Sequence, residues 1–95
     1  MESATARLEA RIHGLVQGVG FRMFARDRAR QLGLAGFVRN EPDGSVLVVA
    51  EGPRADLNAL LAELRRGPRG AHIAHVNTQW APARGDEAAR FEVRF

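Results

Sequence analysis

Three glycines and an arginine lie close together near the N-terminus, in the segment His13-Gly14-Leu15-Val16-Gln17-Gly18-Val19-Gly20-Phe21-Arg22. Glycine allows positive φ and close approach to a ligand, so consecutive backbone N–H groups can point into one hollow. A helix beginning near Phe21 would add the positive end of its dipole, and Arg22 could bind two phosphoryl oxygens. The segment therefore predicts a metal-independent site for a phosphate-sized anion. A turn that only reverses the chain explains the glycine spacing equally well.

The hydrophobic pattern indicates which elements flank this segment. Residues 8–13 alternate apolar and polar, as in a half-buried strand, and residues 21–32 have helical spacing with Gly33 suited to a C-terminal cap. Asp43-Gly44 is a hairpin signal. The remaining expected elements are strands at 37–40 and 46–50, a helix from Gly52-Pro53 to Gly67-Pro68, a weaker strand at 73–80, a polar loop at 84–87 and a short last strand at 91–95.

The order βαββαβ plus an extra C-terminal strand predicts an α+β fold of the ferredoxin-like, split-βαβ type. We expect an antiparallel sheet with both helices on one face and the first and third strands side by side. The first and second strands then run in the same direction, so the glycine-rich segment and Asn40 should meet at one end of the sheet. A carboxamide there can orient a water molecule but is a poor general base.

Length and composition predict a single domain, residues 1–95, with a flexible N-terminus at 1–6. Hydrophobic residues make up 45% of the chain and charged residues 26%, which argues against disorder. No apolar run approaches the roughly 20 residues that span a bilayer, so no membrane partner is expected. The start of the chain lacks the features of a secretory signal. With no cysteine there is no thiol nucleophile or disulfide, and a cytoplasmic location is expected.

All 14 basic residues are arginines, and they face 11 acidic residues. The absence of lysine excludes a Walker-type phosphate loop and Schiff-base chemistry. A net charge of +3 spread along the chain helps to attract a small anion but gives little support to a nucleic-acid partner. His72 and His75 are three residues apart in or near a predicted strand, where they would face opposite sides, so no metal site is expected.

The segment 13–22 closely resembles the acylphosphatase signature, and the resemblance continues through residues 32–40, 43–46, 51–52, 67–68 and 91–95. It implies hydrolysis of the carboxyl–phosphate bond of acyl phosphates to a carboxylate and inorganic phosphate, with no metal, cofactor or phosphoenzyme. Inorganic phosphate or sulfate is expected to bind as a ligand, and a monomer is the default expectation for so small an enzyme. The residues that match the family's site are the loop Leu15, Val16, Gln17, Gly18, Val19, Gly20 and Phe21, the arginine Arg22, and the water-orienting Asn40.

Several residues near the expected site allow more than one interpretation. Phe37 stands where the family commonly has tryptophan, and Glu41-Pro42 stands where hydroxyl residues are common, so this carboxylate could repel substrate or disturb Asn40. We interpret Ser45 as a turn residue rather than a support for Asn40 or the loop. His13 is expected to pack at the surface or support the loop rather than act as an acid. Phe24 and Phe21 should be core, and Trp80 a packing residue.

Two further questions stay open at the level of sequence. If the last strand pairs with the fourth, the carboxylate of Phe95 could pair with Arg22. Ferredoxin-like sheets also serve as RNA-binding or regulatory modules, although residues 45–50 lack stacking aromatics. A similar domain occurs within larger carbamoyl-transfer maturation proteins; a chain ending at its last strand favours a stand-alone enzyme. No residue pattern identifies the acyl half of a substrate.

Overall fold

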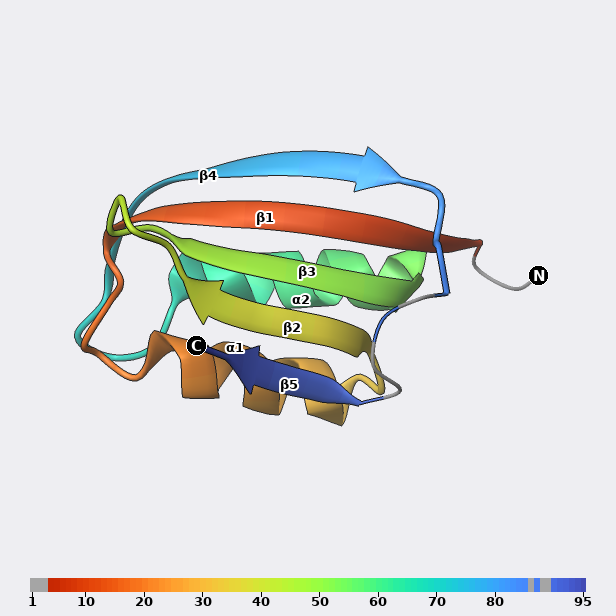
Figure 1. Cartoon of the computed structure of the whole chain (residues 1–95), viewed down its shortest axis with the longest axis horizontal. Coiled ribbons are helices and arrows are strands. Elements are labelled where there is room, and N and C mark those ends of the chain that lie inside the picture. Colours follow the sequence, from red (N-terminus) through yellow and green to blue (C-terminus); the bar gives the residue numbers. More distant parts are fainter. Residues whose placement is uncertain (1–3, 86, 88–89) are drawn as a thin grey trace.

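The computed structural model describes residues 4–85, 87 and 90–95. Both helices cover the same face of a single sheet whose strand order is β4-β1-β3-β2-β5 (Figure 1). The predicted ferredoxin-like fold is thereby confirmed. Over the described residues the elements are β1 (Thr5–Leu15), α1 (Phe21–Gln31), β2 (Ala35–Asn40), β3 (Val46–Pro53), α2 (Arg54–Arg66), β4 (His72–Ala81) and β5 (Phe91–Arg94).

The first four strands form the antiparallel sheet that the sequence predicted. β1 lies between β3 and β4, and β2 pairs with the other side of β3. β5 adds a parallel pair with β2, so the complete sheet is mixed. Because β1 and β2 run in the same direction, the loop that follows β1 and the final residue of β2 lie at the same end of the sheet (Figure 1). That final residue is Asn40.

The last strand does not pair with the fourth, which was the condition for an ion pair between the Phe95 carboxylate and Arg22. β4 and β5 occupy opposite edges of the sheet, and Phe91 pairs with Gly36 of β2. In this position beside β2, Phe91 is completely buried in the core. Val93 is partly buried and packs against the core, and β5 contacts α1. A four-residue strand with one apolar face can bury that face at either edge of the sheet. The alternation of residue types therefore did not specify which strand it would pair with.

The N-terminal segment 1–6 was expected to be flexible, but β1 begins within it. Thr5 pairs with Pro53 and Ala6 with Gly52, and the side chain of Ala6 is buried. Residues 1–3 lie outside the described residues. The sheet therefore accommodates Thr5 and Ala6 because the far end of β3 extends to Pro53.

The core fills the space between the sheet and the two helices. Helix α2 contributes a leucine stripe with helical spacing, made up of Leu57, Leu60, Leu61 and Leu64. Strand β1 contributes alternate residues from the facing side of the sheet, namely Leu8, Ala10 and Ile12. Phe21 is buried as expected, whereas Phe24 is only half-buried, with the guanidinium of Arg28 5.1 Å from its ring centroid. Trp80 packs against the core, as predicted.

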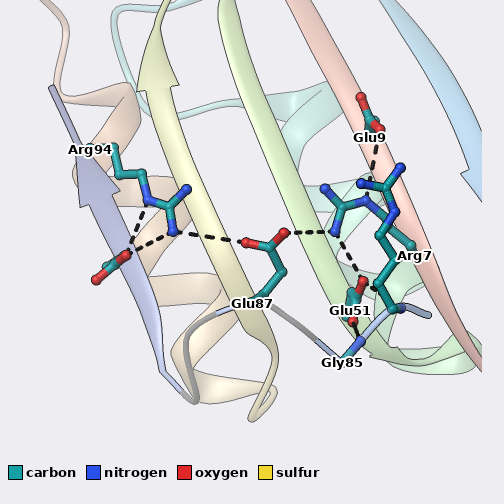
Figure 2. A network of polar contacts seen from close by, with 8 residues as sticks. Arg7, Glu9, Glu51, Gly85, Glu87 and Arg94 are labelled. Carbon is teal, nitrogen blue, oxygen red and sulfur yellow. Dashed lines mark hydrogen bonds and ion pairs between the residues drawn. The ribbon is translucent and has the colours of Figure 1, made fainter.

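A network of ion pairs and hydrogen bonds on the face opposite the helices holds Arg84, Gly85 and Glu87, which lie between β4 and β5 (Figure 2). Arg7 Nη1 donates to Glu51 at 3.0 Å and to Glu87 at 2.7 Å. Glu51 also accepts hydrogen bonds from the backbone N–H groups of Arg84 and Gly85. Burial alone would raise the pKa of Glu51, but these hydrogen bonds outweigh it and lower the pKa. The network thus anchors these three residues to the sheet, and β5 carries the C-terminus toward the loop end.

Candidate active site

In the turn from β1 into α1, no side chain of the described residues caps the first backbone N–H groups of the helix. Gly18 and Gly20 have φ of 78° and 76°, in the left-handed region that residues with a Cβ rarely adopt. Gly20 is the N-cap of α1 and supplies no side-chain hydrogen bond, and the first turn contains no acidic residue. The amide groups and the positive dipole end of the helix therefore remain available to an external anion.

This turn and the end of β2 enclose a small pocket of about 100 Å³. Liquid water occupies about 30 Å³ per molecule, so the pocket has room for a phosphate-sized group but not for a large ligand. Helix α1 supplies three of the lining residues, strand β2 supplies one, and the loop before α1 supplies the rest. The lining residues are Val16, Gly18, Gly20, Phe21, Arg22, Met23 and Asn40.

Three of the loop residues predicted to bind phosphate do not line this pocket. The side chain of Leu15 is exposed and borders a separate hollow with His72 and Ile73. Val19 packs against the core. Gln17 directs its side chain toward the turn between β2 and β3. Any contribution of these three residues to an anion site would come from their backbone N–H groups.

Arg22 and Asn40 face the pocket with uncommitted polar atoms. Both side chains are half-buried, and within the described part of the chain neither makes a hydrogen bond or an ion pair. Arg22 therefore retains its N–H donors, and Asn40 retains both a donor and an acceptor. A guanidinium and a carboxamide on one phosphate-sized pocket can bind an anion and a water molecule side by side.

The C-terminal residue contacts Arg22 through its ring. The guanidinium carbon of Arg22 lies 4.7 Å from the centroid of the Phe95 ring. The ion pair that the Phe95 carboxylate could have formed with Arg22 is not among the ion pairs of the described residues. The chain end reaches the loop because β5 runs parallel to β2, and Arg94 is the last residue in the strand. A ring stacked on the guanidinium face leaves its in-plane N–H groups available to an anion.

Gln17 joins the loop to the turn that follows Asn40, a role that the sequence did not reveal. Its Nε2 donates to the backbone carbonyls of Glu41 and Ser45, both at 2.9 Å. Ser45 is a turn residue, as interpreted: its hydroxyl and its N–H both donate to Asp43 Oδ1. These hydrogen bonds lower the pKa of Asp43. The backbone of the turn, rather than a hydroxyl group, therefore supports the loop.

The carboxylate of Glu41, which could have disturbed Asn40, pairs with two arginines instead and does not line the pocket. Its carboxylate accepts hydrogen bonds from Arg11 Nη1 and Arg39 Nε, both at 3.0 Å. Burial would raise the pKa of Glu41, but these two arginines outweigh it and lower the pKa. Arg39 and Glu41 are two residues apart and share one side of the chain, whereas Asn40 between them faces the other.

His13 lies on the open face of the sheet, opposite the buried Ile12, and outside the pocket. Its ring stacks on that of His75 with 4.3 Å between centroids and 13° between planes. Across residues 4–85, 87 and 90–95, no group of three or more His, Cys, Asp or Glu side chains is arranged to hold a metal ion. In the same residues, neither helix has the length and apolar character needed to cross a membrane.

Comparison with known sequences gives consistent matches. The family model described as Acylphosphatase matches residues 8–93. An acylphosphatase from Nocardia farcinica is 52% identical over 80 residues, which cover 84% of this chain and 80% of the relative. An acylphosphatase from Salinibacter ruber is 50% identical over 95 residues and covers 99% of both chains.

Solved structures agree with the sequence matches. The crystal structure of acylphosphatase from Bacillus subtilis superposes with a TM-score of 0.90 at 29% identity, covering 95% of this chain and 99% of the other. Full-length HypF, in a phosphate- and nucleotide-bound form, has a TM-score of 0.83 at 23% identity over 96% of this chain and 12% of its own. The second match shows the same fold within a much longer protein.

Proposed function

The chain belongs to the acylphosphatase family and is an enzyme that hydrolyses acyl phosphates, and we propose that the pocket between residues 16–23 and Asn40 is its active site. The observation that carries this proposal is the convergence of Arg22 and Asn40 on one phosphate-sized pocket at the N-terminal end of α1. Both side chains are free of other polar contacts in the described residues, as a binding site requires before its ligand arrives.

In the proposed mechanism the phosphoryl group binds to backbone N–H groups of residues 15–21 and to the guanidinium of Arg22. Phosphoryl transfer depends mainly on positioning and on stabilising charge on the equatorial oxygens. Amides fixed by a glycine-rich turn and a helix N-terminus provide that stabilisation without a metal or a cofactor. The same groups would hold inorganic phosphate or sulfate as a competitive ligand.

The proposed role of Asn40 is to orient the attacking water. Its carboxamide oxygen accepts a hydrogen bond from the water, whose oxygen forms the new bond to phosphorus. The bond between phosphorus and the acyl oxygen breaks, and the carboxylate leaves with the electron pair. A carboxylate is a weak base, so its departure needs little general-acid help, and the water proton passes to the phosphate product. No phosphoenzyme forms.

The proposal includes a monomer that acts in the cytoplasm without a nucleic-acid partner. One chain supplies all the residues that line the pocket. The strand at the centre of the open face, β3, carries Leu47, Val49 and Glu51 there and no aromatic ring on which bases could stack. Sedimentation equilibrium at micromolar concentration should give the mass of a single chain.

The direct test is hydrolysis of benzoyl phosphate by the purified protein in the presence of EDTA. We expect turnover that is unchanged by the chelator and inhibited competitively by inorganic phosphate. Loss of activity with EDTA would contradict the metal-independent mechanism. Failure of the pure, folded protein to hydrolyse benzoyl phosphate or acetyl phosphate would contradict the assignment of the pocket.

A further inference from the structure

The large hydrophobic side chains that are exposed in the described residues lie at the loop end of the molecule. They are Leu15, Met23 and Phe95, with exposed fractions of 67%, 50% and 99%. Met23 lines the pocket itself, and the ring of Phe95 lies on Arg22. Exposed apolar side chains that gather beside a polar site indicate a surface that contacts a ligand.

The size of the pocket determines which part of a substrate meets these side chains. A volume of about 100 Å³ accommodates the phosphoryl group and the attacking water. The acyl group must therefore extend out of the pocket mouth. Met23 is a lining residue and follows Arg22 in α1, while the ring centroid of Phe95 lies 4.7 Å from the guanidinium carbon of Arg22. An acyl group leaving the pocket past Arg22 would meet both.

We propose that Met23 and Phe95 form an apolar rim that binds the acyl half of the substrate; this inference rests on the proposed function of the pocket. The rim favours acyl phosphates with an aromatic or longer alkyl acyl group over those with a small one. Methionine is flexible enough to fit different apolar shapes, and the phenyl ring offers an edge and a face. The phosphate loop thus sets the reaction, and the rim sets the acyl preference.

Steady-state kinetics with benzoyl phosphate and acetyl phosphate separate these two functions. Both substrates present the same phosphoryl group, so the ratio of their kcat/KM values reports on the acyl half. The variants Met23→Gln and Phe95→Ser remove apolar character, whereas Met23→Leu and Phe95→Leu preserve it. Ala62→Gln adds an amide side chain at an exposed position of α2 that does not line the pocket, and serves as the control.

We expect each polar variant to raise KM for benzoyl phosphate by about 5-fold. An enclosed apolar pocket discriminates between substrates that differ by one methylene by roughly 10-fold or more, and an open rim should discriminate less. KM for acetyl phosphate should change by less than 2-fold. The leucine variants and the control should keep the wild-type ratio. Phe95→Leu is informative because it removes the ring from Arg22 but keeps an apolar contact for the acyl group.

Inhibition by inorganic phosphate distinguishes the possible failures. Equal changes for both substrates, together with weaker phosphate inhibition, would mean that Met23 and Phe95 act only on the phosphate site, and the rim would be rejected. An unchanged ratio in both polar variants would also reject it. A wild-type protein inactive on both substrates would instead reject the proposed function of the pocket.

Discussion

The side-chain amide of Gln17 lies 2.9 Å from the backbone carbonyl oxygen of Glu41, the residue directly after Asn40. Gln17 belongs to the loop proposed to bind phosphate, and Asn40 is proposed to orient the attacking water. A second bond at 2.9 Å to the carbonyl of Ser45 fixes the same amide to both sides of the turn. The two halves of the site are thus joined by one side chain that does not line the pocket.

Replacing Gln17 by alanine should reduce both stability and turnover. Each lost hydrogen bond contributes about 0.5–1.5 kcal/mol to the free energy of unfolding, so we expect a loss of about 1–2 kcal/mol in urea denaturation. Asn40 would also be held less firmly relative to the loop, so kcat should fall about 10-fold. Gln79→Ala, at an exposed position of β4, is the matched control. A Gln17→Ala variant with wild-type stability and wild-type kcat would show that these two hydrogen bonds have no effect on the site.

Arg22→Lys should nearly abolish turnover, because a point charge cannot replace a planar group that binds two oxygens. We expect kcat/KM for benzoyl phosphate to fall by about 10³-fold, in line with the loss of a major source of transition-state stabilisation. Thermal stability should be maintained, since the described residues give Arg22 no ion pair. Arg26→Lys changes the next arginine of α1, which pairs with Asp27, and should remain active. Comparable activity of the two variants would contradict the role of Arg22.

Asn40→Ala should separate catalysis from binding. The inhibition constant for inorganic phosphate should change by less than about 3-fold, while kcat falls by about 10²-fold because the water is no longer oriented. Asn58→Ala, at an exposed position of α2, provides the control. If phosphate inhibition weakened in parallel with kcat, Asn40 would have to be reassigned to phosphate binding.

The Arg7–Glu51 pair should make stability dependent on acidic pH. The pKa of Glu51 is lowered in the folded state, so its contribution is fully present above the unfolded pKa of about 4.3 and is lost as pH falls through the folded pKa. Glu51→Gln should therefore reduce the free energy of unfolding by about 1.5–3 kcal/mol at pH 7, and by progressively less below pH 4.

Urea denaturation of both proteins at pH 7, 5, 4 and 3 measures this difference. Glu92→Gln alters a carboxylate that is nearly half-exposed, and its effect should be small at every pH because exposed ion pairs contribute little. If the difference in free energy of unfolding between wild type and Glu51→Gln increased as the pH fell, the proposed contribution of ionised Glu51 would be contradicted.

Patterns of residue type predicted the fold and the main features of the site. The alternation near Leu8 and the leucine stripe near Leu60 specified a strand and a helix facing one core. The topology that followed placed the glycine-rich segment and Asn40 at the same end of the sheet, where the structure brings them onto one pocket. These features depend on periodicity and chain direction, both of which are local properties of the sequence.

Long-range contacts of single side chains were less accessible. Gln17 and the turn that it binds are 24 and 28 residues apart, and glutamine in a loop has no pattern that names its partner. The edge chosen by β5, and hence the ring of Phe95 on Arg22, depends on how the core is completed by Phe91. Arg39 and Glu41 are the exception, since their spacing of two along extended chain could have predicted their pairing.

The central claim is that the backbone amides of the loop, together with Arg22, bind the phosphoryl group. Titration of ¹⁵N-labelled protein with inorganic phosphate tests it residue by residue. We predict that saturable shifts concentrate on the backbone amides of residues 16–22 and on the Arg22 Nε–H, and that they are lost from the loop in Arg22→Lys at the same phosphate concentration. Shifts centred on the open face of the sheet around Arg11 and His75, with the loop amides unmoved, would contradict the account.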